Sequence, residues 1–369
     1  MASLGLATKL GAVPATDSST PGSTLIVGTG LVGASIGMAL SARDERVHLA
    51  DRVRSHAIVA AGLGAGTIEP PDPDDVTLVV VAVPPDALAS VIAKALVRYP
   101  RATVTDVGSV KSLVANGLNG TAGVDRYVPS HPMAGSQFTG PITASPHLFV
   151  DRTWVVTPLP TNAPDHVARI ERLATLCGAR VVTMSPDEHD VAVAQVSHLP
   201  HLMSILTAGH LREVPADHLR LAGQGIRDVT RIAGSDPALW RQILTANRAA
   251  VRAELSAVAD DLAELLAVLD DEAGLESFLA RGRAGALSLP GKHGQAPQDY
   301  AAVVVEIPDE PRALARLFTD VADLGVNVED VAIEHDQERQ VGFLAIQVVP
   351  DAAERLAADI VGRGWNLRG

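Results

Sequence analysis

Short apolar runs alternate with helical patterns through the first half of the chain. The runs are rich in Val, Leu and Ile, which is typical of parallel strands buried on both faces. The predicted strands are Leu25–Val27, Val47–Ala50, Leu78–Val83, Ala102–Thr105, Arg126–Pro129, Trp154–Thr157 and Arg180–Thr183. Strands that alternate with helices predict a doubly wound, Rossmann-type α/β domain over residues 23–184.

The pattern changes after Ser185, where one helical segment follows another, broken only by Gly, Pro and Asp. Val251–Leu269 is long, rich in Ala and Leu, and amphipathic. A helical domain often buries such an apolar stripe against a second copy of itself. We therefore predict an all-helical dimerisation domain over residues 185–281, and a homodimer.

A stretch rich in Gly and Pro follows over residues 282–298 and predicts a linker. The tail, residues 299–369, restarts with a strand and continues in the order βαββα, which predicts a small α+β domain. Its predicted elements are Ala302–Ile307, Arg312–Leu324, Val326–His335, Gln340–Val349 and Ala352–Arg363. At the other end, residues 1–22 lack the charged start and apolar block of a signal peptide and predict a disordered extension.

Composition narrows the class of protein. The 369 residues carry 30 Lys and Arg against 43 Asp and Glu, a net charge of −13, which disfavours nucleic acid and anionic membranes as partners. The single cysteine, Cys177, excludes an intrachain disulfide and fits a buried small side chain in a reducing compartment. The sequence contains no run of 18 uncharged apolar residues, so we predict no membrane-spanning helix. We expect a cytoplasmic protein.

A glycine-rich loop follows the first strand and opens a helix. The loop is Gly28, Thr29, Gly30, Leu31, Val32 and Gly33. Its glycines allow a tight turn, a close approach to a pyrophosphate and close helix–strand packing, and the helix N-terminus attracts the phosphates. Asp51 closes the second strand, where its carboxylate can bind both adenosine ribose hydroxyls and repel a 2′-phosphate. The cofactor expected is NAD, although Arg52 and Arg54 weaken the discrimination against NADP.

Three further segments carry polar side chains suited to chemistry. The first two, 106–111 (DVGSVK) and 130–136 (SHPMAGS), each end a predicted strand, at the edge where ligands bind in open α/β sheets. The third group lies in the helical domain: His189, the segment 197–201 (SHLPH), and 227–240 (RDVTRIAGSDPALW).

Together these motifs resemble the prephenate and arogenate dehydrogenases of tyrosine biosynthesis, over nearly the whole chain from Thr24. The tail resembles an ACT regulatory domain. No chorismate mutase module precedes the glycine loop, so the resemblance implies dehydrogenation alone. It implies that a hydride leaves ring C4 of prephenate for NAD while CO2 is lost, giving 4-hydroxyphenylpyruvate. With arogenate as the alternative substrate, tyrosine would form directly.

The resemblance also implies roles for particular residues. His131 would accept the proton of the C4 hydroxyl, a task that suits a neutral imidazole. Ser109 would contact the same hydroxyl and the nicotinamide, although Ser109 also fits as the N-cap of a helix over 110–118. Arg231 would hold the substrate carboxylate with its planar guanidinium, unless it merely pairs with Asp228 on a helix surface.

The roles of the remaining candidate site residues are less specific. His201 would help bind a carboxylate, whereas His198 fits equally well as a packed structural histidine. His189 could be a ligand or a solvated residue at a helix start, and Trp240 could be core or a ligand contact. Gln137 bears on side-chain recognition, because a carboxylate there would favour the ammonium of arogenate. The histidines lack the spacing of a metal site.

Two other classes remain as alternatives. A β-hydroxyacid or imine reductase also joins a Rossmann domain to a helical dimer domain, but it usually places a Lys, Ser or Thr there, and no Lys lies between Lys111 and Lys292. A non-catalytic NAD sensor would not need His131 together with Arg231.

The turn after the first strand of the tail bears on regulation. ACT domains commonly bind an amino acid at this turn, which usually ends in Pro-Gly, but here Arg312 stands in the place of the glycine. Arg312 could pair with an effector carboxylate or with Asp309 and Glu310 beside it. We favour the pairing with the acidic residues, and thus a structural, dimerising tail with weak or no tyrosine feedback.

Overall fold

The structure is a computed structural model that describes residues 22–135, 140–289, 300–308, 310–336 and 341–368. The predicted N-terminal extension lies outside these residues, apart from Gly22. The chain forms two compact units. The first contains the described residues up to Leu211 together with Thr230–Leu255, and the second contains Arg212–Val229 and the described residues from Ser256 onward.

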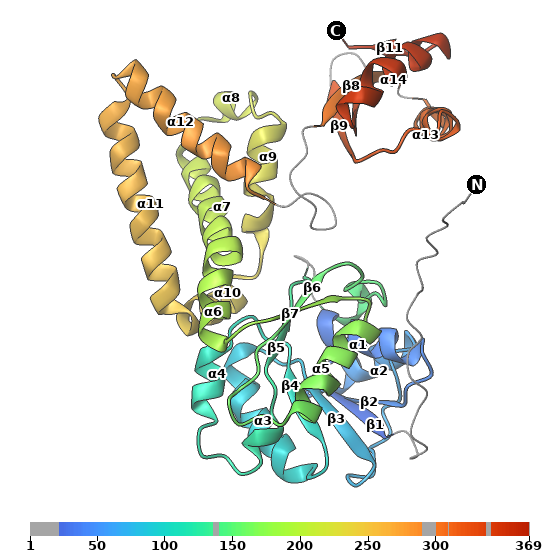
Figure 1. Ribbon diagram of the computed structural model, residues 1–369, viewed down its shortest axis with the longest axis vertical. Helices are drawn as coiled ribbons and strands as arrows, with labels where there is room; N and C mark the ends of the chain where they lie inside the picture. The colour runs from blue at the N-terminus through green and yellow to red at the C-terminus, as the bar shows by residue number, and fades with distance from the viewer. Residues whose placement is uncertain (1–21, 136–139, 290–299, 309, 337–340, 369) are drawn as a thin grey trace, which may run out of the picture. The chain divides into compact units, whose positions relative to one another are not determined.

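A four-stranded parallel sheet lies at the centre of the first unit (Figure 1). The strand order is β2-β1-β3-β4, with bounds β1 (Ser23–Val27), β2 (Val47–Ala50), β3 (Val76–Val81) and β4 (Thr103–Asp106). The elements that follow these strands are α1 (Leu31–Ser41), α2 (Arg54–Gly62), η1 (Pro85–Ala87), α3 (Leu88–Arg98) and α4 (Ser112–Gly117). Ile26, Val80 and Val104 are fully buried. The near-continuous apolar runs thus mark strands covered on both faces, as predicted.

A second sheet departs from the all-parallel expectation. Its order is β5-β6-β7, and β5 pairs antiparallel with β6 while β7 pairs parallel. Its elements, with the turns around them, are η2 (Val124–Arg126), β5 (Ser130–Pro132), η3 (Pro141–Thr143), β6 (Thr153–Val156), α5 (Pro164–Leu176) and β7 (Arg180–Thr183).

The strand predicted over Arg126–Pro129 is wrong, because Arg126 belongs to a turn. Its guanidinium donates hydrogen bonds to the carbonyl oxygens of Leu96 and Ala102, each at 2.7 Å. These bonds satisfy one carbonyl group at the end of α3 and one just before β4, and regular strand pairing begins only at Ser130. Cys177 follows α5 and is buried as expected, and burial raises the pKa of its thiol to about 12.

One continuous helical stretch, Pro186–Glu213, leads out of the second sheet. It comprises α6 (Pro186–Val193), a π-helical turn η4 (Ala194–His198), α7 (Leu199–His210) and η5 (Leu211–Glu213). The π turn lies directly before Pro200, whose ring nitrogen cannot donate the next helical hydrogen bond. Within the described residues this is the one helix whose length and mean hydropathy of 1.2 would suit a membrane span. This stretch also carries Asp190 and three buried histidines, so we interpret it as a helix that packs within the folded protein.

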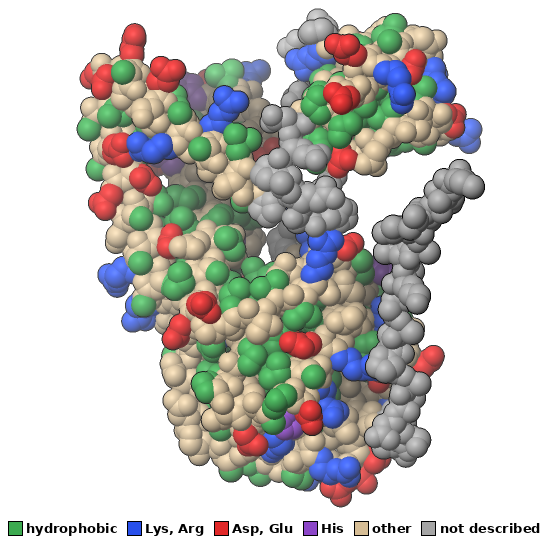
Figure 2. All heavy atoms as spheres, in the orientation of Figure 1, with side chains coloured by type: hydrophobic (Ala, Val, Ile, Leu, Met, Phe, Trp, Pro, Cys, Tyr) green, Lys and Arg blue, Asp and Glu red, His purple; other side chains and the backbone are tan. Residues whose placement is uncertain are grey.

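The helices between this stretch and the tail are α8 (Ala216–Leu219), α9 (Gln224–Thr230), η6 (Arg231–Gly234), α10 (Pro237–Ala246), α11 (Arg248–Val268) and α12 (Glu272–Leu287). The predicted linker 282–298 begins too early, because α12 continues to Leu287. Good helix formers such as Arg283, Ala284 and Leu287 outweigh the nearby glycines. Residues 290–299 of that linker lie outside the described part of the chain. Hydrophobic side chains remain exposed among acidic ones along α11 and α12 (Figure 2); they include Leu262, Leu266, Leu269, Leu279 and Leu287.

The tail forms an antiparallel sheet in the order β11-β8-β10-β9. Its elements are β8 (Ala301–Pro308), α13 (Ala313–Asp323), β9 (Asp330–Asp336), β10 (Val341–Val348), α14 (Pro350–Gly362) and the short β11 (Asn366–Leu367). Val305, Leu317, Leu344 and Leu356 form its buried core. The order βαββα is therefore present as predicted, with β11 added.

Candidate active site

The glycine loop joins β1 to α1, and its three glycines differ in what a side chain at each position would meet. Gly28 has φ +96°, and a Cβ there would lie 2.3 Å from the carbonyl oxygen of Ala82. A Cβ on Gly33 would lie 2.0 Å from the carbonyl oxygen of Gly28. A Cβ on Gly30 would instead meet nothing within 4 Å. Gly28 and Gly33 are thus required by packing, whereas Gly30 leaves open space beside the helix N-terminus.

The N-terminus of α1 is suited to an anion. Gly30 is its N-cap residue and makes no side-chain capping bond, and no acidic residue lies in the first turn. The N–H groups of a first helical turn have no partners within the helix, and the helix dipole is positive at this end. A pyrophosphate fits this cradle, which agrees with the predicted dinucleotide site over Gly28–Gly33.

Asp51 follows β2 and holds the same loop in place. Its Oδ2 accepts hydrogen bonds from Thr29 N at 2.7 Å and from Thr29 Oγ1 at 2.9 Å. Its Oδ1 accepts one from Val53 N at 2.8 Å. The carboxylate lies at the carboxyl end of β2, as the ribose-binding role requires, and it is partly exposed. Asp51 therefore shapes the loop in addition to the ribose contact that the sequence predicts.

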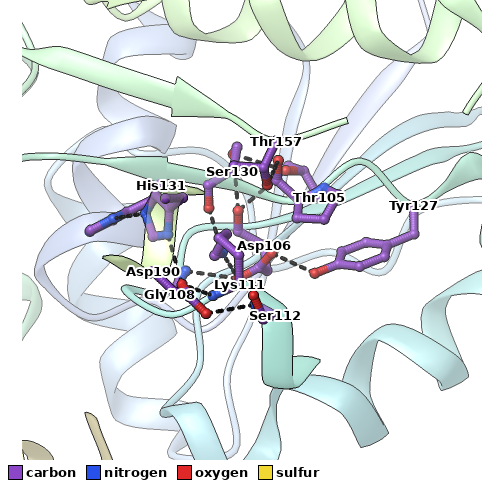
Figure 3. Close-up of polar contacts among 12 residues, drawn as sticks. Thr105, Asp106, Gly108, Lys111, Ser112, Tyr127, Ser130, His131, Thr157 and Asp190 are labelled. Carbon is purple, nitrogen blue, oxygen red and sulfur yellow. Dashed lines mark hydrogen bonds and ion pairs between the residues drawn. The ribbon is translucent and has the colours of Figure 1, made fainter. Parts of the chain in front are cut away.

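The turn after β4 is organised by two buried charges, Asp106 and Lys111 (Figure 3). Lys111 Nζ donates to Asp106 Oδ2 at 2.5 Å and to the carbonyl oxygen of Ser130 at 2.7 Å. Asp106 Oδ2 also accepts from Gly108 N, and Asp106 Oδ1 accepts from Tyr127 Oη at 2.7 Å. Burial lowers the pKa of Lys111, and the neighbouring Asp106 carboxylate opposes that shift. Lys111 thus fixes the turn that carries Ser109 against the start of β5.

Asp190, from α6, reaches the same turn. Its Oδ1 accepts from Lys111 N at 2.8 Å, and its Oδ2 accepts from Ser112 N at 2.9 Å. These bonds cap α4, which begins at Ser112. The alternative that Ser109 is the N-cap of a helix over 110–118 is therefore wrong, because a carboxylate from another helix supplies the cap. Ser109 lies, partly exposed, in the turn before it.

His131 lies on β5, beside the carboxyl end of β4. Its Nδ1 is 2.9 Å from His189 Nε2, and the two rings meet edge to face at 5.1 Å. His189 Nδ1 is in turn 2.8 Å from Asp190 Oδ1. His189 is fully buried, so the alternative that it is a solvated residue at a helix start is wrong. The fold turns it inward because Ser185 and Glu188 cap α6 and fix where the helix begins.

The surroundings of His131 keep its imidazole neutral. Desolvation lowers the pKa of His131 well below its usual range, and the nearby His189, Lys111 and His198 lower it further. His131 is nevertheless a partly exposed residue. A neutral, accessible imidazole at the sheet edge that carries the glycine loop can accept a proton from a bound hydroxyl.

Two more predicted histidines pack around Trp240. The His201 ring stacks on the indole at 3.4 Å and 4°, and the His198 ring meets it edge to face at 6.0 Å. His198 Nδ1 also lies 3.3 Å from Asn247 Nδ2, and burial lowers the pKa of His198 to about 4. His201 Nε2 and Ser204 Oγ are buried without a hydrogen-bond partner. His198 is thus placed as a structural residue, whereas His201 keeps a buried polar atom whose hydrogen bond is not supplied by the described residues.

The last two predicted substrate contacts are Arg231 and Gln137, and the structure shows less of their surroundings. Arg231 begins η6, which packs against α7, and its side chain is exposed. Asp228, its proposed surface partner, has Oδ1 bonded to Gln224 Nε2 at 2.8 Å. Among the described hydrogen bonds and ion pairs, none joins Arg231 to His131. Gln137 lies outside the described residues.

Models of two protein-family domains match consecutive parts of the chain. Residues 36–183 match "Prephenate dehydrogenase, nucleotide-binding domain", and residues 185–280 match "Prephenate dehydrogenase, dimerization domain". This chain belongs to the prephenate dehydrogenase family. As a member it is an NAD-dependent oxidoreductase that forms a homodimer through its helical domain.

Individual relatives of this dehydrogenase cover most of its length. A probable prephenate dehydrogenase, NovF, of Streptomyces niveus is 34% identical over 92% of this chain and 98% of its own. A cyclohexadienyl dehydrogenase of Zymomonas mobilis is 31% identical over 69% of this chain and 91% of its own. A solved prephenate dehydrogenase from A. aeolicus, in complex with hydroxyphenyl propionate and NAD+, is 27% identical, with a TM-score of 0.67 over 74% of this chain and 99% of that one.

Sequence reasoning missed Asp190, Lys111 and Asn247 as parts of this dehydrogenase site. Asn247 Nδ2 donates to the carbonyl oxygen of Asp190 at 2.6 Å, so it holds the residue that caps α4. Lys111 and Asp190 are 79 positions apart. No local pattern indicates that contact: Lys111 ends the motif 106–111, whereas Asp190 follows His189 and lies in none of the motifs.

Proposed function

We propose that this chain oxidises prephenate to 4-hydroxyphenylpyruvate, with loss of CO2 and reduction of NAD. The observation that carries the proposal is His131, an accessible neutral imidazole beside the carboxyl end of β4 in a member of this family. The glycine loop and Asp51 would hold the dinucleotide at the same edge of the sheet. When bound, the nicotinamide ring accepts the hydride that leaves ring C4.

The residues of the chain act on the hydroxyl and the carboxylates. His131 Nε2 takes the hydroxyl proton as the C4–H bond breaks, so that positive charge does not build up on the oxygen. The bond to the ring carboxylate then breaks, CO2 departs, and its electron pair completes the aromatic ring. The phenol oxygen recovers the proton from His131. Because aromatisation supplies driving force, the main task of the protein is alignment.

Binding of the substrate falls to residues of the helical segments and to Ser109 in the turn after β4. We assign the carboxylate contact to the guanidinium of Arg231, with His201 Nε2 as a second contact. Ser109 would contact the hydroxyl, and Trp240 would form a wall through its stack on His201. Arogenate is the second candidate substrate, because a solved arogenate dehydrogenase from Synechocystis is 26% identical with a TM-score of 0.62.

The experiment that tests this function follows NADH absorbance with purified protein, NAD and either substrate. We expect turnover with prephenate and a lower kcat/KM with arogenate. The reverse order would assign the enzyme to arogenate, and turnover of neither substrate would refute the proposal.

We also propose that the tail is an ACT-like domain with a structural, dimerising role and weak or no tyrosine feedback. Arg312 supports this, since it has φ +75° in the turn where ACT domains usually place glycine. A side chain at this position would restrict the approach that a glycine leaves open. Asp309, one of its expected ion-pair partners, lies outside the described residues. Calorimetric titration of the full-length dimer with tyrosine should give no saturable heat; a micromolar signal abolished by Arg312→Ala would overturn this view.

A further inference from the structure

An unbroken chain of polar contacts runs from a buried carboxylate to the imidazole at the sheet edge. Asp190 Oδ1 lies 2.8 Å from His189 Nδ1, and His189 Nε2 lies 2.9 Å from His131 Nδ1. His189 is fully buried and Asp190 nearly so. Both ring nitrogens of His189 are therefore used, and the one ring nitrogen of His131 outside this chain is Nε2.

The direction of these hydrogen bonds follows from Asp190. Its carboxylate already accepts the backbone N–H groups of Lys111 and Ser112, so it is held as an acceptor. Burial raises the pKa of Asp190, but hydrogen bonds from His189, Lys111 and Ser112 overcome this and leave the pKa below its usual value. The carboxylate is ionised at neutral pH and requires a proton on His189 Nδ1.

The remaining positions are then determined. A neutral His189 with its proton on Nδ1 presents a lone pair at Nε2. His131 must donate to that lone pair from Nδ1, which leaves His131 Nε2 without a proton. The other tautomer of His131 would place two lone pairs against each other at 2.9 Å. Burial disfavours protonation of His131, and the positive charge of the nearby Lys111 disfavours it as well.

We propose that Asp190 and His189 are positioning residues that hold His131 in the Nδ1-protonated tautomer, with Nε2 ready to accept the substrate proton. The inference rests on the proposed function for the identity of that substrate. When the hydroxyl proton moves to Nε2, His131 becomes a cation, and the ionised Asp190 stabilises it through His189. A carboxylate that orients a histidine base in serine proteases acts by the same physical principle.

The Asp190→Asn variant tests the carboxylate. An amide at this position can donate to His189 Nδ1, which moves the His189 proton to Nε2 and reverses the tautomer of His131. We expect kcat to fall by about 10²- to 10⁴-fold while KM for substrate and NAD stays within about threefold. Asp187→Asn is the matched control, because exposed Asp187 on the same helix accepts from Ser112 Oγ at 2.7 Å and shares no described hydrogen bond with either histidine. We expect that variant to resemble the wild type.

A pair of substitutions at His189 keeps the test decisive if Asp190→Asn does not fold. In His189→Gln, the amide oxygen can take the place of Nε2 as acceptor for His131 Nδ1. In His189→Met, that acceptor is lost. We expect the Gln variant to keep kcat within about tenfold of wild type and the Met variant to lose at least about 100-fold. Equal loss in the two variants, at equal melting temperatures, would overturn the proposal.

A spectroscopic measurement separates this inference from the proposed function. Nitrogen-15 NMR of histidine-labelled protein, with His131→Asn to assign the signals, reports which nitrogen of His131 carries the proton without any substrate. We expect an unprotonated Nε2 in the wild type and a protonated Nε2 in Asp190→Asn. A wild-type protein with its proton on Nε2 would refute the inference even if prephenate is turned over. The expected spectra with no turnover would refute only the proposed function.

Discussion

Lys111 and Asp106 form an ion pair in a part of the protein that is closed to solvent. Because Lys111 also binds the carbonyl oxygen of Ser130, this pair ties the turn that carries Ser109 to the strand that carries His131. Neither side chain is expected to react. Their contribution is to fix the distance between two segments of the active site.

Removing one member of this pair should destabilise the protein strongly. In Lys111→Met the Asp106 carboxylate stays buried without its cation, and we expect the free energy of unfolding to fall by about 3–5 kcal/mol. Urea denaturation measures it. Lys94→Met, at an exposed lysine on α3, should change stability by no more than about 0.5 kcal/mol. A loss in Lys111→Met no larger than in this control would contradict the structural role.

The His131→Asn variant tests the proton acceptor. The asparagine amide can still donate to His189 Nε2, so the fold should survive while the acceptor at Nε2 is lost. We expect kcat to fall by about 10²- to 10⁴-fold with little change in KM. His210→Asn, at an exposed histidine of α7, is the control and should be fully active. A His131 variant with wild-type kcat at its pH optimum would rule out this assignment.

The acid side of the pH profile should report the lowered pKa of His131. Protonation fills the lone pair at Nε2, so kcat/KM for the substrate falls as the pH drops through that pKa. The midpoint of kcat/KM should therefore lie below 6.5, measured at saturating NAD. The pKa of His198, lowered to about 4, means that stability is full above pH 6.5 and is lost as the pH falls toward 4, so circular dichroism is recorded alongside. A midpoint at or above 6.5 in folded protein would argue against a desolvated base.

Arg231→Ala should act on substrate affinity. Loss of a carboxylate contact costs about 2–4 kcal/mol, which corresponds to an increase in KM of roughly 30-fold or more. Arg248→Ala, another exposed arginine of the same compact unit, should leave KM unchanged. If KM stays constant in Arg231→Ala while the melting temperature drops, the arginine is structural.

Asp51→Ser should shift cofactor preference toward NADP. The carboxylate that repels a 2′-phosphate is removed, while Arg52 and Arg54 remain to attract it. Because Asp51 also holds Thr29, KM for NAD should rise as well. The ratio of kcat/KM for the two cofactors is the measurement, with Asp74→Ser as a control at an exposed carboxylate. A wild-type enzyme that uses both cofactors equally would show that Asp51 does not discriminate.

The sequence by itself determined the elements whose signals are local. Buried parallel strands are mostly apolar, so β1 to β4 could be predicted directly, although β4 also buries Thr103, Thr105 and Asp106. The glycine loop was equally clear, since Gly28 and Gly33 lie where any side chain would collide with backbone. Arg126 shows where this reasoning fails, because its three hydrogen bonds to distant carbonyl groups replace a predicted strand with a turn.

Only the tertiary structure decided how the candidate residues work together. Asp190 is 79 positions from Lys111, and His189 is 58 positions from His131. No defined role for His189, and no role at all for Asp190, could therefore be predicted from the sequence. A hydrogen bond is specified by distance and direction in space, and neither is encoded in the local pattern of apolar and polar residues. His131 could be predicted from its motif, but the contacts that fix its tautomer exist only after α6 has packed against α4.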